Sequence, residues 1–293
     1  MIDGFINKHR LSSHFNEMAK VHFIPLSERI RTHQLSAKKP YFVGINGSQG
    51  SGKSTLSDFI QAYLQQNYEA KVIVLSLDDF YFSQIERNII AQDVHPLFKT
   101  RGVPGTHNMS QAKQVLHALK LGQPTLIPRF NKATDNPYKQ ADWTLVADPV
   151  DIIIFEGWSW GVDPQNAHQL VHPVNDFERL EDSNGEWRNH ANLQLALHYK
   201  PLYQMMNKWI MLKAPSFADV FNWRLEQEQK LIDATPIELR PNIMDKVEVE
   251  RFIQHYQRLT EHALNTLPNK CDEVFSLNSL RDITAHQTRK NHA

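Results

Sequence analysis

A glycine-rich stretch at residues 47–54, with the letters GSQGSGKS, holds the groups best suited to chemistry in this sequence. It fits the pattern G-x-x-x-x-G-K-[ST], in which glycines let backbone N–H groups converge on an anion and a following helix adds the positive end of its dipole. The lysine of this pattern can bridge the β- and γ-phosphates of a nucleotide, and its hydroxyl residue can bind Mg²⁺. The pattern predicts binding of ATP or GTP with Mg²⁺ by Gly47, Ser48, Gln49, Gly50, Ser51, Gly52, Lys53, Ser54 and Thr55.

The residues on either side of this stretch fit a strand–loop–helix unit. Residues 41–45 (YFVGI) form a short apolar run typical of a buried strand that enters the loop. This context favours a phosphate-binding loop, with Lys53 and the metal ligand Ser54 opening the helix, over a glycine-serine turn without a ligand. Beyond the loop, apolar residues recur at the spacing of one helix face, at Leu56, Phe59, Ile60, Tyr63 and Leu64.

Two adjacent acids, Asp78 and Asp79, follow the apolar run at residues 71–76. Because the carboxyl ends of parallel strands meet at one edge of an open α/β sheet, these carboxylates are expected to face the same crevice as Lys53. A carboxylate there can accept the proton of an acceptor hydroxyl and aim the oxygen at the γ-phosphorus. The alternative is an aspartate pair that caps a turn, but such caps usually need only one aspartate.

A third acid, Glu156, ends the strongest strand signal, the largely apolar run at residues 150–155. A carboxylate at this position can hold Mg²⁺ directly or through a water molecule. The alternative is an acid that ends a strand before a glycine turn. Glu156 is therefore the second predicted metal ligand, beside Ser54.

Two other classes of nucleotide enzyme fit less well. Guanine recognition would need the pattern N-K-x-D, and residues 131–135 (NKATD) place the acid one residue too late to bind both guanine N–H donors from the same turn. A mechanical ATPase would show a second acid after Glu156, where this chain has Gly157 and Trp158. Both comparisons favour a kinase that uses ATP.

Cations and aromatic residues that suit a small anionic acceptor lie in two loops. Residues 101–107 (RGVPGTH) form a glycine- and proline-rich loop before a helix, and Arg129 and Lys132 follow a short strand. With His107, these two cations are candidates for holding an acceptor carboxylate. Each segment, taken alone, is as compatible with a solvated turn as with an acceptor-binding site. The predicted acceptor-binding set is Asp79, Tyr81, Arg101, His107, Arg129, Lys132 and Trp158.

Composition narrows the class of protein. The 32 basic and 32 acidic residues balance, which argues against nucleic acid or an anionic membrane surface as the main partner. A single cysteine, Cys271, excludes a disulfide framework and a cysteine-based zinc site. Residues 1–10 lack the apolar core of a signal peptide, and no apolar run approaches transmembrane length. A cytoplasmic protein is expected, and the sequence leaves its oligomeric state open.

Strand and helix signals alternate along the chain, which predicts a doubly wound α/β fold. Strands are predicted at residues 41–45, 71–76, 150–155, 209–212 and 273–277, with a short edge strand between the prolines at 124–128. Helices are predicted within residues 1–39, from residue 108 to Gly122, at 216–232 and at 245–266. Residues 162–207 are expected to form an α-helical insertion, so that residues 1–293 make up a single domain.

The chain resembles the P-loop kinases of small metabolites, which include uridine kinase, phosphoribulokinase and bacterial pantothenate kinase. All of these place an aspartate in an x-x-D-x-F segment after the second strand, matched here by Asp78 and Phe80. Within this group the chain is most similar to the glycerate 3-kinase family of plants and fungi and its bacterial predicted-kinase relatives. The matching segments lie in the same order along the chain, at residues 47–55, 76–81, 101–107, 128–132, 155–161, 173–175, 187–188, 214–217, 223–228 and 251–260.

The resemblance implies a five-stranded parallel sheet with helices on both faces, and phosphorylation of a hydroxyl by ATP, with D-glycerate as the leading acceptor. It implies that Asp78 takes the acceptor proton and that Arg224 is a lid arginine reaching the transferred phosphoryl group. A surface salt bridge beside a buried Trp223 is the alternative for Arg224. The predicted catalytic set is thus Asp78, Lys53 and Arg224. The alternatives for function are a kinase of pantothenate or a nucleoside, and a nucleotide-binding regulatory protein without catalysis.

Two positions depart from the pattern of this family. The family usually has an aspartate after G-T-H, where this chain has Asn108. It often has an arginine after the acid that follows the lysine, where this chain has Asn136 after Asp135. If both positions face the acceptor, its charge environment differs from that in a typical member. The non-catalytic alternative rests on these two departures.

Overall fold

The computed structural model describes residues 1–37, 40–234, 244 and 246–289. Its central sheet is built from β1 (Tyr41–Gly47), β2 (Val72–Ser76), β7 (Ile152–Gly157), β8 (Lys208–Lys213), β9 (Glu273–Leu277) and β10 (Ile283–Thr288). Their order across the sheet is β10-β9-β8-β1-β7-β2. Neighbouring strands run parallel, except that β10 pairs with β9 in the antiparallel sense.

The five parallel strands are the five that the apolar runs predict. β1 and β7 are buried along their whole length, as expected for central strands covered on both faces. The edge strand expected at 124–128 is β3 (Thr125–Ile127), which pairs with β6 (Thr144–Val146) in a separate two-stranded sheet. A second small sheet is the hairpin of β4 (Phe130–Asn131) and β5 (Asn136–Pro137).

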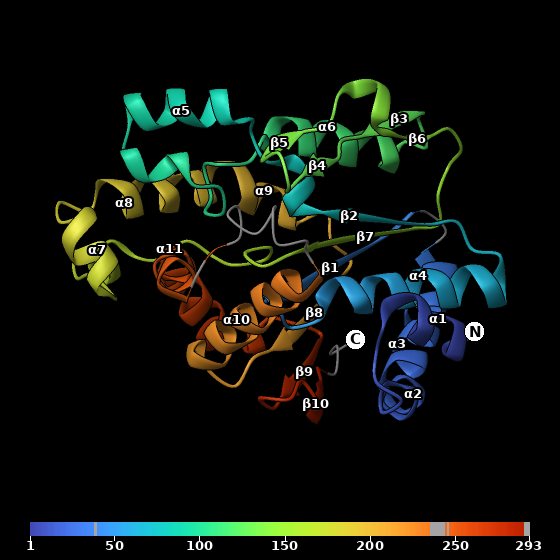
Figure 1. Cartoon of the computed structure of the whole chain (residues 1–293). Coiled ribbons are helices and arrows are strands. Elements are labelled where there is room, and N and C mark those ends of the chain that lie inside the picture. The colour runs from blue at the N-terminus through green and yellow to red at the C-terminus, as the bar shows by residue number, and fades with distance from the viewer. Residues whose placement is uncertain (38–39, 235–243, 245, 290–293) are drawn as a thin grey trace.

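Helices cover both faces of the sheet (Figure 1). In this view α4 (Lys53–Tyr68) and α10 (Phe217–Ala234) lie below β2 and β7, and α5 (Gln84–Asp93) and α6 (Met109–Lys120) lie above these two strands. The helix predicted at 245–266 is α11 (Lys246–Thr266), and residue 245 lies outside the described residues. Most of the apolar stripe predicted for α4 is buried, at Leu56, Phe59, Ile60 and Leu64.

The N-terminal segment packs on α4 within the same chain. It holds α1 (Ile2–His9), α2 (Phe15–Met18), a π-helical turn and α3 (Ile24–Ala37). The rings of Phe5, Phe15 and Phe23 surround Phe59 of α4, with centroids 5.4, 5.9 and 5.8 Å from its own. Each of these rings is buried, so the segment extends the hydrophobic core beyond the outer side of α4.

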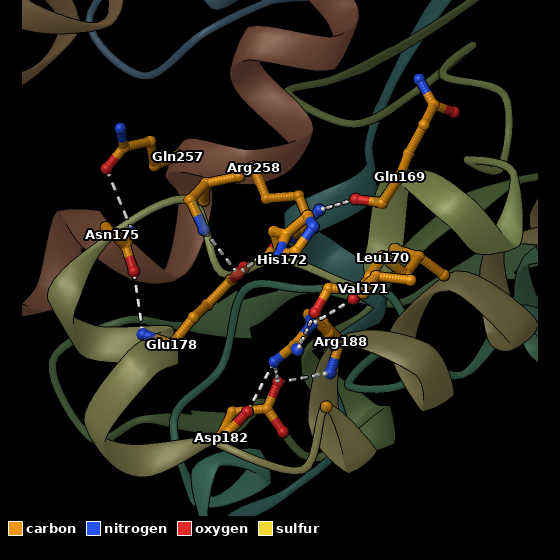
Figure 2. A network of polar contacts seen from close by, with 12 residues as sticks. Gln169, Leu170, Val171, His172, Asn175, Glu178, Asp182, Arg188, Gln257 and Arg258 are labelled. Carbon is orange, nitrogen blue, oxygen red and sulfur yellow. Dashed lines mark hydrogen bonds and ion pairs between the residues drawn. The ribbon is translucent and has the colours of Figure 1, made fainter.

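Residues 162–207 are largely helical and include α7 (Asp176–Glu181), α8 (Glu186–Gln194) and α9 (Lys200–Tyr203). Figure 2 shows how α7 is tied to α11 by the ion pair of Glu178 and Arg258, with N···O distances of 2.7 and 2.6 Å. A second pair, Asp182 with Arg188, closes the turn between α7 and α8 at 2.8 Å. Among the described residues, no helix has both the length and the apolar character needed to cross a membrane.

Candidate active site

The predicted functional residues converge at the carboxyl edge of the parallel sheet. β1 leads into the glycine-rich loop, and β2 leads into a short 3₁₀ helix, Leu77–Phe80, that carries the two aspartates. The strand register pairs Glu156 of β7 with Ser76 on one side and with Ile45 on the other. The acids predicted from separate segments of the sequence therefore lie beside the loop, as the rule for open α/β sheets requires.

The loop has the backbone of an anion-binding turn at the start of a helix. Gly50 and Gly52 have φ values of 76° and 89°, which residues with a Cβ rarely adopt. α4 begins at Lys53, immediately after Gly52. The N-terminus of this 16-residue helix adds its positive dipole end to the site. The local backbone geometry thus fits the phosphate-binding loop that the glycine spacing predicts.

Lys53, Ser54 and Glu156 form one polar cluster. The Ser54 hydroxyl donates to Oε1 of Glu156 at 2.9 Å, and the Lys53 ammonium lies 3.9 Å from Oε2. Glu156 is only 3% exposed, and its Oε2 accepts no hydrogen bond from any residue that the structure describes. Burial raises the pKa of Glu156, against the opposing charge of Lys53. A buried carboxylate with an unused oxygen beside a serine hydroxyl fits the needs of Mg²⁺.

Asp78 and Asp79 face different partners. Lys132 donates to Oδ2 of Asp78 at 2.7 Å. Burial alone would raise the pKa of Asp78, but the charges of Lys132 and Lys53 outweigh it and hold the pKa below that of an ordinary aspartate. Asp79 accepts from Arg129 at 2.8 Å and from the N–H of Phe130 at 3.3 Å. Asp78 is therefore an ionised acceptor near Lys53, whereas Asp79 anchors the β3–β4 connection.

A cavity of about 630 Å³ lies over this cluster, within the size range of small-molecule sites. Its cationic wall comes from separate segments, and each cation has a carboxylate partner: Arg101 pairs with Asp135, and Arg224 on α10 pairs with Glu228. The predicted site residues that line it are Gln49, Gly50, Lys53, Ser54, Asp78, Asp79, Tyr81, Arg101, Arg129, Lys132, Glu156 and Arg224.

Two predicted acceptor-binding residues lie one layer behind the cavity wall. His107 stacks on Tyr81 with ring centroids 4.2 Å apart, and its Nδ1 lies 2.7 Å from the Tyr199 hydroxyl. Burial lowers the pKa of His107 to about 3, so the ring is neutral near pH 7. Trp158 is 4% exposed and donates from its indole N–H to the Gly102 carbonyl at 3.2 Å. Both residues support the wall from behind.

Two aromatic residues of α11, Phe252 and Tyr256, line the cavity although the sequence analysis does not assign them to the site. The Tyr256 hydroxyl donates to the Arg101 carbonyl at 3.0 Å. Gly102 has a φ of 148°, and a Cβ there would lie 2.4 Å from that hydroxyl, so a glycine is required beside Arg101. The sequence does hold one signal that could have identified them: the two aromatic residues lie one helical turn apart, on the same face of a predicted helix.

The two departures from the family pattern are accounted for by helix capping. Asn108 precedes α6, and its Oδ1 accepts from the N–H of Gln111 at 3.0 Å. The Oδ1 of Asn136 accepts from the N–H of Gln84, the first residue of α5, at 3.0 Å. Neither asparagine lines the cavity. Because asparagine and aspartate are equally good N-terminal caps, an aspartate at position 108 could cap α6 in the same way.

Comparisons with known proteins show that this chain is similar to kinases. A model of the phosphoribulokinase/uridine kinase family matches residues 42–178. An uncharacterized kinase of Schizosaccharomyces pombe is 32% identical over 244 residues, which cover 79% of this chain and 84% of that protein. The chloroplastic D-glycerate 3-kinase of Arabidopsis thaliana is 29% identical over 222 residues, 70% of this chain and 46% of that protein. A pantothenate kinase of Streptococcus gordonii is 29% identical over 164 residues, 56% of this chain and 51% of that protein.

A solved structure shares the fold over nearly the whole chain. The D-glycerate 3-kinase from Cryptococcus neoformans superposes with a TM-score of 0.74, covering 91% of this chain and 99% of that one at 20% identity. The phosphate loop, the acids at the carboxyl edge of the sheet and the identity to the S. pombe kinase all indicate a P-loop kinase. The chain belongs to the phosphoribulokinase/uridine kinase family of P-loop kinases and is an ATP-dependent small-molecule kinase.

Proposed function

We propose that this kinase transfers the γ-phosphoryl group of ATP to a hydroxyl of a small carboxylated metabolite, with D-glycerate as the leading candidate. The observation that carries the proposal is the shared cavity in which Asp78 and Lys53 lie beside Arg101, Arg129 and Lys132. Such a wall can neutralise both a transferred phosphoryl group and an acceptor carboxylate. The likeness to the plant and fungal proteins named D-glycerate 3-kinase supports this choice of acceptor.

The proposed reaction assigns a task to each group. The loop and Lys53 hold the ATP phosphates, and Asp78 accepts a hydrogen bond from the acceptor hydroxyl and aims its oxygen at the γ-phosphorus. As the new O–P bond forms, the bond from the γ-phosphorus to the bridging oxygen breaks, the hydroxyl proton passes to Asp78 and ADP leaves. Arg224 turns from Glu228 to the transferred group. Ser54 and Glu156 would hold Mg²⁺, which would supply further neutralisation of charge.

Replacing Lys53 with alanine is expected to weaken ATP binding by about tenfold to a hundredfold. The reason is the loss of a charge-assisted contact to phosphate, of the kind worth about 1.5–3 kcal/mol. The measurement is calorimetric titration with ATP and Mg²⁺. Lys99→Ala, in a 3₁₀ turn that does not line the cavity, is the matched control and should bind as the wild type does. Unchanged affinity in the Lys53 variant would refute the assignment of the phosphate loop.

The acceptor is tested by ADP release with Mg-ATP in the presence of D-glycerate, pantothenate, uridine or no acceptor. We expect D-glycerate to give the largest stimulation. Pantothenate is the second candidate, because it is also a carboxylate with a free hydroxyl and because of the likeness to the streptococcal pantothenate kinase. Stimulation by pantothenate alone would show that pantothenate, and not D-glycerate, is the acceptor, and the proposed mechanism would still stand. ATP binding without ADP release in any of the four mixtures would favour the non-catalytic alternative.

A further inference from the structure

The turn between β9 and β10, residues 278–282, contacts the phosphate loop from outside the cavity. Arg281 donates from Nε to the carbonyl oxygen of Gly50 at 2.8 Å, a contact between residues 231 positions apart in the sequence. Arg281 does not line the cavity, so it is not placed to touch a substrate there. Its contact is with the backbone of the loop that binds phosphate.

The Arg281 side chain is held by α10 on two sides. Its guanidinium carbon lies 5.2 Å from the ring centroid of Trp223, and its Nη2 lies 2.7 Å from Oε2 of Glu226. The indole N–H of Trp223 in turn donates to the carbonyl of Ser279, in the same turn as Arg281, at 2.7 Å. The planar guanidinium thus joins the phosphate loop to α10 through three separate contacts.

The backbone at Arg281 is also held in an uncommon conformation. Its φ is 71°, a region that residues with a Cβ rarely adopt. The side-chain oxygen of Asn278 accepts from the N–H groups of Leu280 and Asp282, both at 2.9 Å, and the Asn278 carbonyl accepts from the N–H of Arg281 at 2.9 Å. Such a conformation persists when its surroundings fix it. The turn therefore presents the guanidinium in a defined direction.

Gly50 is also in close contact with Trp223. A Cβ on Gly50 would lie only 2.6 Å from the Cβ of Trp223, so α10 rests directly against the loop backbone. The next residue on α10 is Arg224, which lines the cavity. Gly50 thus contacts both Arg281 and Trp223, and α10 carries both a support of the loop and a cation that lines the cavity.

We propose that Arg281 is a positioning residue for nucleotide binding. The proposal rests on the proposed function, in which the loop at Gly50 binds the phosphates of ATP. Glycine has more conformational freedom than any other residue, and the loop's N–H groups can converge on an anion only while the peptide units keep their orientation. By holding the Gly50 carbonyl, Arg281 fixes this orientation before ATP arrives, which reduces the ordering cost of binding.

The test compares Arg281→Ala and Arg281→Lys with Arg289→Ala. Arg289 lies just beyond the other end of β10, is exposed and donates to the Asn269 carbonyl at 3.3 Å, so it matches the loss of charge without the contact to the loop. We expect Arg281→Ala to weaken binding of ATP with Mg²⁺ by about tenfold, as for loss of a charge-assisted hydrogen bond. The ATP affinity of Arg281→Lys should lie between those of the wild type and Arg281→Ala, because one ammonium cannot bind both Gly50 and Glu226. Binding is measured by calorimetry below the melting midpoint of every variant.

Kinetics separate positioning from general damage. Arg281→Ala should raise the KM for ATP by a larger factor than it lowers kcat, and should leave the KM for the acceptor unchanged. Equal ATP affinity in Arg281→Ala and Arg289→Ala would overturn the inference and leave the kinase function standing. Parallel losses for ATP and for the acceptor would also overturn it, because they indicate disruption of the whole site. Failure of the wild type to bind ATP would overturn the proposed function and this inference together.

Discussion

Asp78→Asn is expected to lower turnover by about 10²–10⁴-fold while ATP binding is retained, which is the range for loss of a positioned general base. Asparagine keeps the size of the side chain but removes the charge that attracts the hydroxyl proton. Asp78 suits this task because it lies near Lys53 and is held ionised by Lys132 at 2.7 Å. Since the transition state of phosphoryl transfer is loose, a base of low pKa can act mainly by aiming the hydroxyl and take its proton late.

The neighbouring carboxylate gives the sharpest comparison. Asp79→Asn removes the same charge one residue away, but Asp79 is engaged by Arg129 and by the N–H of Phe130. It should raise the KM for the acceptor and leave most of kcat. Equal falls in kcat for the two variants would show that Asp78 has no special role, and turnover close to wild type in Asp78→Asn would exclude it as the base.

The pH profile provides a second check on Asp78. A base must be ionised to act, and the charges of Lys132 and Lys53 lower its pKa, so its protonation begins only below the ordinary aspartate range near pH 4. We therefore expect no acid limb from Asp78 between about pH 7 and pH 5. Lys132→Met, which removes the main stabilising charge, should move that limb to higher pH. A profile unchanged by this substitution would contradict the assignment.

The parts of the site that lie within one strand-to-helix connection are predictable from sequence. The phosphate loop, Asp78 and Glu156 each follow an apolar run, and one topological rule places all three at the same edge. The partners of the cationic wall are not predictable in this way. Asp135 accepts from both Arg87 and Arg101, which belong to α5 and to a loop, and no local pattern connects these three residues.

Burial explains why chemically suitable residues can lie outside the cavity. His107 and Trp158 are of types that commonly bind ligands, and both belong to segments that do reach the site. The sequence does not show which of two successive layers a side chain occupies, because this depends on the packing of Tyr81, Tyr199 and Tyr256 around it. Asn108 and Asn136 show the converse, because both have structural tasks that only the positions of the helix ends reveal.

The fold likewise has elements that a local sequence signal predicts and elements that it does not. Central strands are predictable because burial on both faces requires an almost unbroken apolar run. β10 lacks this signal: its sequence, ITAHQT, is mostly polar, and none of its residues is fully buried at this edge of the sheet. It is identified only by its antiparallel pairing with β9, which also positions the turn bearing Arg281. An element with a weak local signal can thus carry a contact important for the site.

Glu178→Gln is expected to lower the free energy of unfolding by about 3–5 kcal/mol, the usual cost of breaking a buried ion pair. The side chains of Glu178 and Arg258 are 1% and 6% exposed. The remaining donors of Arg258 are committed to the carbonyls of Gln169 and His172, at 2.8 and 2.7 Å. Glutamine keeps the shape of the glutamate but leaves the buried guanidinium without a counter-charge (Figure 2).

The same two helices supply a matched control for this prediction. Arg251 of α11 and Glu181 of α7 also form an ion pair, but their side chains are 54% and 38% exposed. Glu181→Gln should cost less than about 1 kcal/mol, because water replaces the lost partner. Urea unfolding at neutral pH, with similar slopes for both variants, measures the difference.

A double replacement separates the charge from the packing. Glu178→Leu with Arg258→Met removes both buried charges, so it should recover much of the stability that either single change loses. Equal, small effects of Glu178→Gln and Glu181→Gln would show that burial does not set the strength of the pair. Because α11 also presents Phe252 and Tyr256 to the cavity, Glu178→Gln should raise the KM values of the kinase before it unfolds the protein. The pair that joins α7 to α11 therefore also holds one wall of the cavity.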